Sequence, residues 1–329
     1  TRLLIDDTLE LGVGLAISHG GQAILRDARV SHAQTDGLLV EHLDSRLQAQ
    51  DLLVDNIAGD TATLIGGSAL SVVQGARASI ERARLTHATS IGVELDNVGS
   101  RLVLAGVQID ATRGSLMNGS NGNGVQVARG AELMMVGGRV IDNQYAGLVI
   151  GSKGSHGTVA GTRICATRAA PVPDVVDAEF DPGGIGIGTV LGAELHLLES
   201  VVEDSRTAGV VYHGGHGHVR GCVIRATKGA SYLLSDRKTW FGDGILIHST
   251  AHVDVTNSLV TDSARAGVLV SHSDHITIGA TQASANLWGL ALDHAEVAFP
   301  SANGWLGNGV SNRAGGLTLA VPAAPELAQ

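Results

Sequence analysis

Large aromatic side chains are scarce in this sequence. Phe, Trp and Tyr make up 3% of the 329 residues, whereas the hydrophobic fraction reaches 44%. A core must therefore be built from Val, Ile, Leu and Ala, which suits narrow strand layers. Proline is also rare, and the six prolines lie within 171–182 and 300–325. No proline-rich linker divides the chain, so we expect one domain.

Basic residues and long apolar runs are few as well. Lys and Arg number 22 against 32 Asp and Glu, a formal net charge of −10, so the chain lacks the basic surface that nucleic acid requires. No apolar run approaches the roughly 18–20 residues that cross a bilayer, and we expect no membrane insertion. Cys165 and Cys222 form no CxxC motif, so we expect free, buried thiols.

Glycine, by contrast, is abundant, with 45 residues spread along the chain. A glycine followed by alternating aliphatic residues recurs at a base interval of about 23 residues, and every second interval up to Gly209 carries 9 to 16 more. The starts of these segments are Gly14, Gly37, Ala69, Gly92, Gly124, Gly147, Gly186, Gly209, Gly244, Gly267, Gly289 and Gly309.

Within each segment, short period-2 alternations are separated by turn residues, as in Val253, Val255 and Val260. This pattern predicts strands with inward aliphatic side chains, and no segment has a helical period. One segment cannot bury its apolar face alone, but stacking at about 4.8 Å per coil makes a continuous core. The sequence therefore predicts an all-β, single-stranded parallel β-helix of about 12 coils over 1–320, with loops in alternate coils and a C-terminal tail at 321–329.

The glycine-aliphatic register resembles that of the right-handed parallel β-helix repeat superfamily, which includes pectin-lyase-like and other carbohydrate-binding or sugar-hydrolase β-helices. The resemblance covers the whole chain and implies right-handed winding. It implies no single function, because that superfamily contains lyases, hydrolases, epimerases, tailspikes and adhesins. It also implies a secreted, periplasmic or cell-surface protein. Because the sequence opens with Thr1, we expect that any leader has been removed or was never part of this sequence. Uncapped solenoid ends associate, so an oligomer or a larger parent chain is a further expectation.

The extra residues of alternate coils predict loops along one edge, at about 59–67, 113–122, 168–184 and 228–243. The last two loops hold four of the nine aromatic residues: Phe180, Tyr232, Trp240 and Phe241. Sugar rings stack on such side chains, which suggests a ligand-binding edge. The alternative is that these rings fold back as a plug over the neighbouring coil.

Charged residues at the bases of the loops suggest a second kind of contact. Arg113, Arg168 and Lys228 follow Ala-Thr in three loops and could bind the carboxylates or sulfates of an acidic polysaccharide, or could be solvated turn residues. Residues 18 positions after the coil starts are predicted to form one outward file: His32, Asp55, His87, Asp110, Asp142, Cys165, Asp204 and Asp262. Asp110, Asp142 and Asp204 are candidate calcium ligands, although Asp is also a common turn residue. No cofactor other than calcium is suggested.

Histidines form another predicted file, four or five residues after the coil starts. Its members are His19, His42, Asn97, His213, His248, His272 and His294, with His216, His218, His252 and His275 close behind. Imidazoles can stack as a structural ladder, bind a transition metal or gain charge near pH 6.5. We include His213, His216 and His248 among the candidate ligand-binding residues.

Catalytic motifs of the superfamily are incomplete. Gly215-His216-Gly217 matches one motif of the galacturonan hydrolases, but the sequence has no Asn-Thr-Asp, and no Asp-Asp lies about 20 residues upstream of the match. Calcium-dependent lyases pair acidic ligands with a basic residue that removes a proton. Asp204, Asp243, Arg168, Lys228 and Arg237 supply these residue types, without a spacing that fixes their geometry.

Three functions therefore compete. The first is a non-catalytic extracellular or envelope β-helix that binds carbohydrate along the loop edge. The second is a lyase or hydrolase of an acidic polysaccharide, with its site between the 168–184 and 228–243 loops. The third is a structural segment of an adhesin or fibre. Whether the chain is an enzyme is left open by the sequence.

Overall fold

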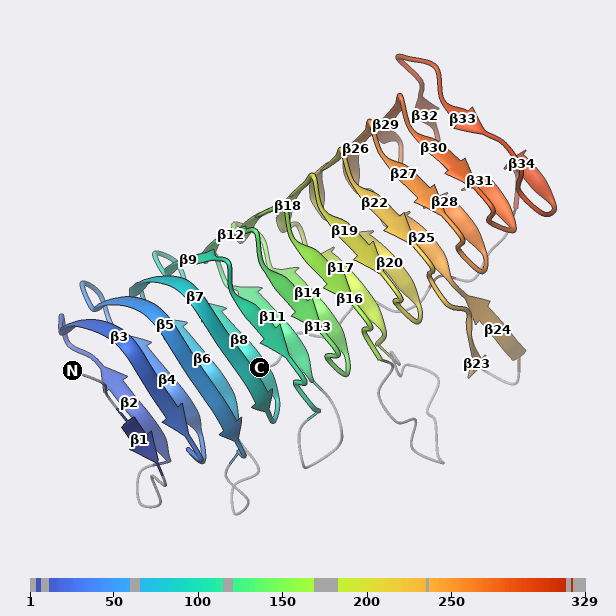
Figure 1. The fold of residues 1–329 in the computed structure, drawn as a ribbon. Coiled ribbons are helices and arrows are strands. Elements are labelled where there is room, and N and C mark those ends of the chain that lie inside the picture. The colour runs from blue at the N-terminus through green and yellow to red at the C-terminus, as the bar shows by residue number, and fades with distance from the viewer. Residues whose placement is uncertain are drawn as a thin grey trace.

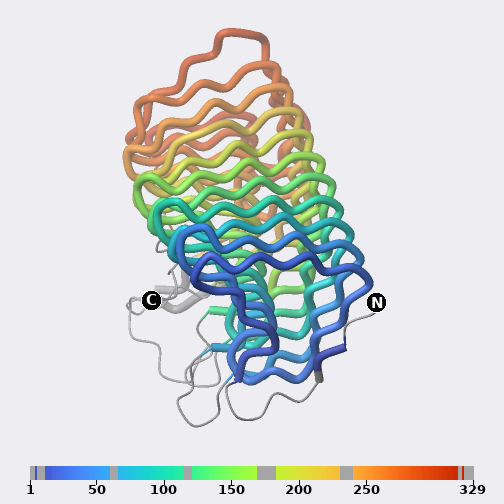
Figure 2. The backbone as a smooth tube through the Cα atoms, turned by 90° about the vertical axis from the view of Figure 1, so that its left-hand side faces the viewer, coloured from blue at the N-terminus to red at the C-terminus, as the bar shows by residue number. Residues whose placement is uncertain are grey.

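The chain winds as a stack of coils. The computed structural model describes residues 4–6, 12–59, 66–114, 121–168, 183–234, 237–317 and 321, with the backbone alone at 230–234 and 237–239. No helix occurs among these residues, and a typical coil contributes three short strands. Figures 1 and 2 show the coils lying side by side along one axis. The predicted right-handed parallel β-helix is confirmed.

The first strands of the coils form a parallel sheet of twelve, which we call the first sheet. Its members are β2 (Val13–Ile17), β4 (Asp36–Glu41), β6 (Ser68–Val73), β8 (Ile91–Asp96), β11 (Asn123–Ala128), β14 (Ala146–Gly151), β17 (Ile185–Val190), β20 (Ala208–His213), β25 (Asp243–His248), β28 (Ala266–Ser271), β31 (Trp288–Asp293) and β34 (Ser311–Ala314). The register places the predicted starts from Gly14 to Gly289 opposite one another. Gly309 is wrong as the last start, because Leu290 pairs with Arg313 and so Gly289 faces Asn312.

The second and third strands of the coils form the remaining walls. The second strands are β9 (Arg101–Ala105), β12 (Glu132–Val136), β15 (His156–Ala160), β18 (Glu194–Leu198), β21 (His216–Arg220), β26 (His252–Thr256), β29 (His275–Gly279) and β32 (Val297–Ala298). The third strands are β1 (Leu4–Asp6), β10 (Gln108–Asp110), β13 (Arg139–Ile141), β16 (Arg163–Cys165), β19 (Val201–Glu203), β22 (Val223–Arg225), β27 (Leu259–Thr261), β30 (Gln282–Ser284) and β33 (Gly304–Trp305). In three early coils, β3 (Gln22–Ser31), β5 (Arg46–Ile57) and β7 (Arg77–Ala88) run through both walls.

Aliphatic side chains from all three walls fill the interior. Val253, Val255 and Val260 are at most 2% exposed and belong to one continuous cluster. Cys165 and Cys222 are free and buried, as predicted. The coil-start glycines are required by close packing: a Cβ at Gly147 would lie 2.4 Å from the carbonyl oxygen of Gly186 and 2.6 Å from Cγ2 of Ile164.

The insertions all interrupt the same corner, which we call the last corner, between a third strand and the next first strand. Longer connections follow β5, β10, β16 and β22, whereas short ones follow β3, β7, β13, β19 and β27. The predicted alternation of loops on one flank is thus confirmed. The fourth insertion contains an antiparallel hairpin of β23 (Ala230–Leu234) and β24 (Arg237–Phe241), which projects from the stack in Figure 1.

Candidate functional site

The outer face of the first sheet carries an unexpected polar network. Two residues per coil face outward here: the one before the coil-start position and the second one after it. From β14 onward most of these residues are apolar and make a separate buried cluster that includes Ala146, Val149, Val211 and Leu246; the exception is Asp243 on β25, which pairs with Arg265. In the earlier coils these positions include Leu39, Ile91 and Ser68, but also a set of five neighbouring polar residues, namely Asp36, Ser71, Glu94, Asn123 and Gln126. We call these five residues the polar network.

A serine joins two carboxyl groups at one end of this network. Ser71 Oγ donates to Asp36 Oδ1 at 2.5 Å and lies 3.4 Å from Glu94 Oε2. A hydroxyl group has a single proton, so the second contact is a hydrogen bond only when a protonated Glu94 donates to Ser71. The geometry thus favours a chain of two hydrogen bonds that runs from Glu94 through Ser71 to Asp36.

The surroundings of Glu94 favour that protonated form. Burial, and after it the nearby carboxylates of Asp36 and Asp96, raise the pKa of Glu94 to about 7, against smaller opposing effects of Ser71 and Arg129. Burial also raises the pKa of Asp36. Glu94 is consequently poised to gain or lose a proton near neutral pH, which is typical of functional carboxyl groups.

Two amide side chains continue the network into the next coil. Gln126 on β11 pairs in register with Glu94 on β8, and Asn123 Nδ2 donates to Gln126 Oε1 at 3.1 Å. Asn123 is fully buried, and its Oδ1 has no hydrogen-bond partner among the described residues. A buried acceptor of this kind is suited to receive a donor from a ligand or a bound water.

An ion pair borders the network. Arg129 Nε lies 2.8 Å from Oδ1 of Asp96, and more than half of the Arg129 side chain is exposed. The hydrogen bond to Asp96 raises the pKa of Arg129, so this residue keeps its charge at the rim of the face. At the other end of this face, from β14 onward, Leu317 and Val321 pack against the apolar cluster.

The predicted outward file of Asp and His is split between two neighbouring positions. Asp55 in β5 and the strand ends Asp110 and Cys165 share one position, in register with Thr86, Ile141 and Glu203. His32, His87, Asp142, Asp204 and Asp262 come one residue later, in a left-handed turn with φ of 54–58°. The split arises because the corner before the second strand differs in length by one residue between coils.

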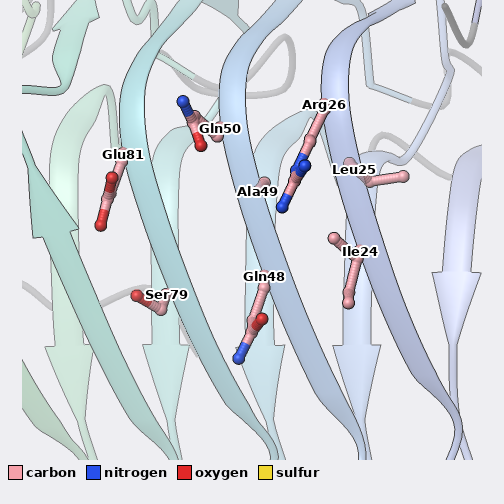
Figure 3. Close-up of a pocket in the computed structure, with 8 residues that line it drawn as sticks. All are labelled: Ile24, Leu25, Arg26, Gln48, Ala49, Gln50, Ser79 and Glu81. Carbon is pink, nitrogen blue, oxygen red and sulfur yellow. The ribbon is translucent and has the colours of Figure 1, made fainter. Parts of the chain in front are cut away.

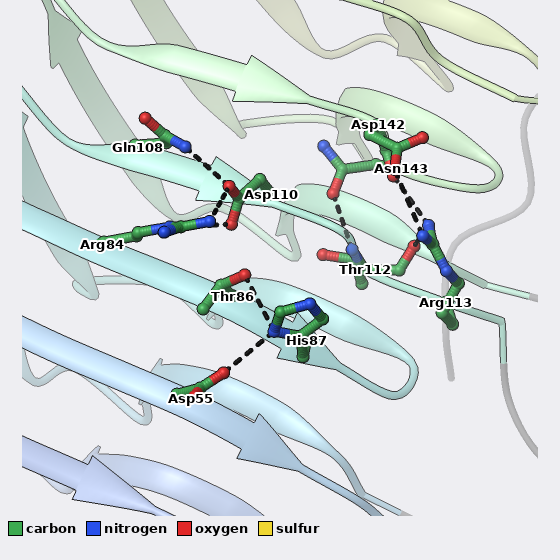
Figure 4. Close-up of polar contacts among 10 residues, drawn as sticks. All are labelled: Asp55, Arg84, Thr86, His87, Gln108, Asp110, Thr112, Arg113, Asp142 and Asn143. Carbon is green, nitrogen blue, oxygen red and sulfur yellow. Dashed lines mark hydrogen bonds and ion pairs between the residues drawn. The ribbon is translucent and has the colours of Figure 1, made fainter.

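The carboxylates proposed as calcium ligands each contact a cation instead of one another (Figure 4). Asp110 accepts from Arg84 Nη2 at 2.9 Å and Gln108 Nε2 at 2.6 Å. Asp142 pairs with Arg113 at 3.2 Å and with Arg168. Lys228 Nζ lies 2.9 Å from Asp204. Across the described residues, no group of three or more His, Cys, Asp or Glu is arranged to hold a metal ion.

The residues predicted on the fourth insertion have different environments. Trp240 is 58% exposed, whereas Phe241 is 2% exposed and lies 5.4 Å from the guanidinium carbon of Arg265. Asp243 is fully buried and accepts from Arg265 Nε at 2.8 Å, so it anchors the hairpin base instead of facing a ligand. The plug alternative therefore describes Phe241. Phe180 and the side chains of Tyr232 and Arg237 lie outside what the structure describes.

The histidines form ladders at the corner between the first and second strands. Ring centroids lie 5.0 Å apart for His213 and His248, 5.7 Å for His248 and His272, and 5.1 Å for His272 and His294. Only His213 and His248 occupy the strand end, since His272 falls one residue later in the turn. Burial and the neighbouring imidazole lower the pKa of His213.

Two hollows lie away from the polar network. One, of about 260 Å³, lies where β3, β5 and β7 bend, and its lining includes the exposed side chains of Arg26, Gln48 and Glu81 (Figure 3). The other, of about 400 Å³, lies beside Lys228 and Asp262 at the last corner. Neither hollow brings a set of perturbed carboxyl groups together as the polar network does.

Comparison with known proteins agrees with this architecture. The family model "Right handed beta helix region" matches residues 65–283, more than half of the chain. The chain belongs to this right-handed β-helix family. The β-helix superimposes on a variant of the periplasmic alginate epimerase AlgG with a TM-score of 0.55, at 12% identity, over 95% of this chain and 76% of that one.

A second solved structure gives a similar result. For the A-module of the Azotobacter vinelandii mannuronan C-5 epimerase AlgE4 the TM-score is 0.52, at 12% identity, over 98% of this chain and 91% of that one. At such identities these likenesses show the fold alone. No curated protein matches the sequence of this β-helix. Its described residues include no helix able to cross a membrane.

Proposed function

We propose that the protein binds a polysaccharide along the outer face of the first sheet, over β4 to β11. The observation that carries this proposal is the polar network, which places two carboxyl groups, a hydroxyl group and two amides together on a face whose other end is mostly apolar. Such groups both donate and accept hydrogen bonds, as sugar hydroxyls require. The site differs from the loop edge predicted from the sequence, although the insertions border the same face.

The regular spacing of the coils favours a polymer as the ligand. Each coil advances about 4.8 Å along the axis, so a chain laid along the sheet meets a new outward side chain at every step. The β-helices that share this fold include epimerases of alginate and mannuronan, which guides the choice of polymers to test. A polysaccharide ligand would also place the protein in the periplasm, at the cell surface or outside the cell.

A second candidate is catalysis on an acidic polysaccharide. Glu94 favours it, because a carboxyl group with a pKa of about 7 can act as general acid or base near neutral pH. Glu94→Gln would then abolish turnover while retaining binding through Gln126 and Asn123. New unsaturated ends, detected by absorbance at about 235 nm, would identify a lyase, and new reducing ends would identify a hydrolase.

Binding is tested on a glycan array and then by calorimetry with the polymers that bind. We expect Gln126→Ala together with Ser71→Ala to weaken binding by about tenfold or more, because several hydrogen bonds are lost. Glu132→Gln, on the exposed second-strand wall, is the matched control and should bind as the wild type does. Unchanged affinity in the double variant, or loss of binding in Trp240→Ala alone, would move the site to the insertions and contradict the proposal.

A further inference from the structure

A second surface, on the wall made by the second strands, carries an array of histidines. Neighbouring strands β15, β18, β21, β26 and β29 place their outward residues in two rows. The first row is His156, Glu194, His216, His252 and His275, and the second row is Thr158, His196, His218, Asp254 and Thr277. We call these ten residues the histidine array. It lies on a different wall from the polar network, so its role is independent of polysaccharide binding.

Carboxylates occupy only part of this array. Glu194 accepts from His156 and His196, each at 2.8 Å, and Asp254 lies 3.2 Å from His218. His216, His252 and His275 have no carboxylate within ion-pair distance among the described residues. Their rings nevertheless lie close together, with centroids 5.1 Å apart for His216 and His252 and 4.5 Å apart for His252 and His275.

These three imidazoles are exposed. A neutral imidazole has a free ring nitrogen lone pair, which is what a transition-metal ion binds. Exposed neighbouring imidazole rings that have no acidic partner make few favourable contacts with each other in water. Packing alone therefore gives little reason for histidine to occupy this position on three neighbouring strands.

We propose that His252 and His275 together bind one divalent d-block cation such as Zn²⁺ or Ni²⁺, with His216 and His252 as an overlapping alternative pair. With metal–nitrogen bonds of about 2.0–2.1 Å, two imidazoles on one ion have ring centroids about 5 Å apart, which matches both pairs. Water supplies the remaining ligands, because the part of the chain that the structure describes arranges no third protein donor around either pair. Calcium is not expected to bind here, since it prefers oxygen ligands.

The test is calorimetric titration of the full, tag-free protein with zinc chloride at neutral pH. We expect the wild type to bind zinc and the variant His252→Asn with His275→Asn to lose about tenfold or more in affinity. His32→Asn with His87→Asn, at the last corner on the other side of the stack, is the matched control and should bind as the wild type does. Thermal unfolding gives a second readout: zinc should raise the melting temperature of the wild type and the control but not of the array variant, and calcium should raise none of them.

Two results would overturn the proposal. One is the absence of binding by the wild type at zinc concentrations up to about 1 mM, where even a weak two-imidazole site would be occupied. The other is equal zinc affinity in the wild type and the array variant, since the ion would then lie elsewhere. Glycan binding is measured separately without metal, so failure of either proposal leaves the other intact.

Discussion

Glu94 gives the polar network a pH dependence that can be worked out from its surroundings. In an unfolded chain its pKa is near the ordinary value of 4.5, whereas in the folded protein burial and neighbouring carboxylates raise it to about 7. Below pH 4.5 both states are protonated and Glu94 has no effect on stability. Between pH 4.5 and 7 the unfolded state loses its proton first, so the free energy of unfolding falls, and above pH 7 the full penalty remains.

The size of that penalty follows from the pKa difference. Each unit corresponds to about 1.4 kcal/mol, so a rise from 4.5 to about 7 destabilises the folded protein by up to about 3 kcal/mol at pH 8. Glu94→Gln removes the charge and supplies an amide N–H that can donate to Ser71, as the protonated carboxyl group does. We therefore expect the variant to gain stability relative to the wild type as pH rises, from little difference at pH 4.5 to about 3 kcal/mol at pH 8.

The measurement is urea unfolding of both proteins across this pH range, with the difference in free energy taken from the midpoints and slopes. Glu132→Gln serves as the control, because Glu132 is about half exposed beside Arg101 and its removal should give a small, nearly constant difference. A difference between Glu94→Gln and the wild type that stays flat from pH 4.5 to 8 would refute the assignment of a neutral, partly buried carboxyl group.

Two further substitutions, each paired with a control substitution, test how the stack is held together. Both are read from shifts of the urea midpoint. Asp243→Ala removes the carboxylate that pairs with the buried guanidinium of Arg265 and should lower the free energy of unfolding by about 3–5 kcal/mol. Asp254→Ala is the control: Asp254 is in a half-exposed pair with His218, and its removal should cost about 1 kcal/mol or less. Gly147→Ala should cost about 1–3 kcal/mol through its collision with the next coil, and Gly315→Ala, which has open space around it, should change stability by less than about 0.5 kcal/mol.

The winding of the chain was predictable because one steric requirement repeats in every coil. The start residue lies too close to the backbone of the next coil to carry a large side chain, so glycine recurs there and reveals the period. The prediction fails at Gly309, because the last coil has Asn312 opposite Gly289 and the repeated glycine no longer marks the register. The predicted files of Asp and His were misaligned for a related reason. Counting a fixed number of residues from each start glycine ignores that the corner between the first and second strands differs in length by one residue between coils.

The polar network was harder to predict, although its signal is present in the sequence. Gly92-Val-Glu-Leu and Gly124-Val-Gln-Val place Glu94 and Gln126 where other coils have Val149 or Leu246. If the side chains alternated strictly along the strand, Gly92 and Gly124 would lie on the same outward face as Glu94 and Gln126. In the structure the glycine turns toward the core and the residue before it faces outward. Only this local break brings Asp36 and Asn123 to the same face as Glu94.

The division of this face into a polar and an apolar part limits the length of ligand that it can hold. Most outward residues from β14 onward belong to the apolar cluster against which Leu317 and Val321 pack, so the polar stretch is confined to β4, β6, β8 and β11. At about 4.8 Å per coil this stretch is about 15 Å long, roughly the length of three sugar units. We therefore expect affinity to rise with oligosaccharide length up to about three or four units and then to level off, which titration with a size series would show. Affinity that keeps rising with longer chains would mean that the ligand also contacts the insertions, and the site would have to be extended beyond the polar network.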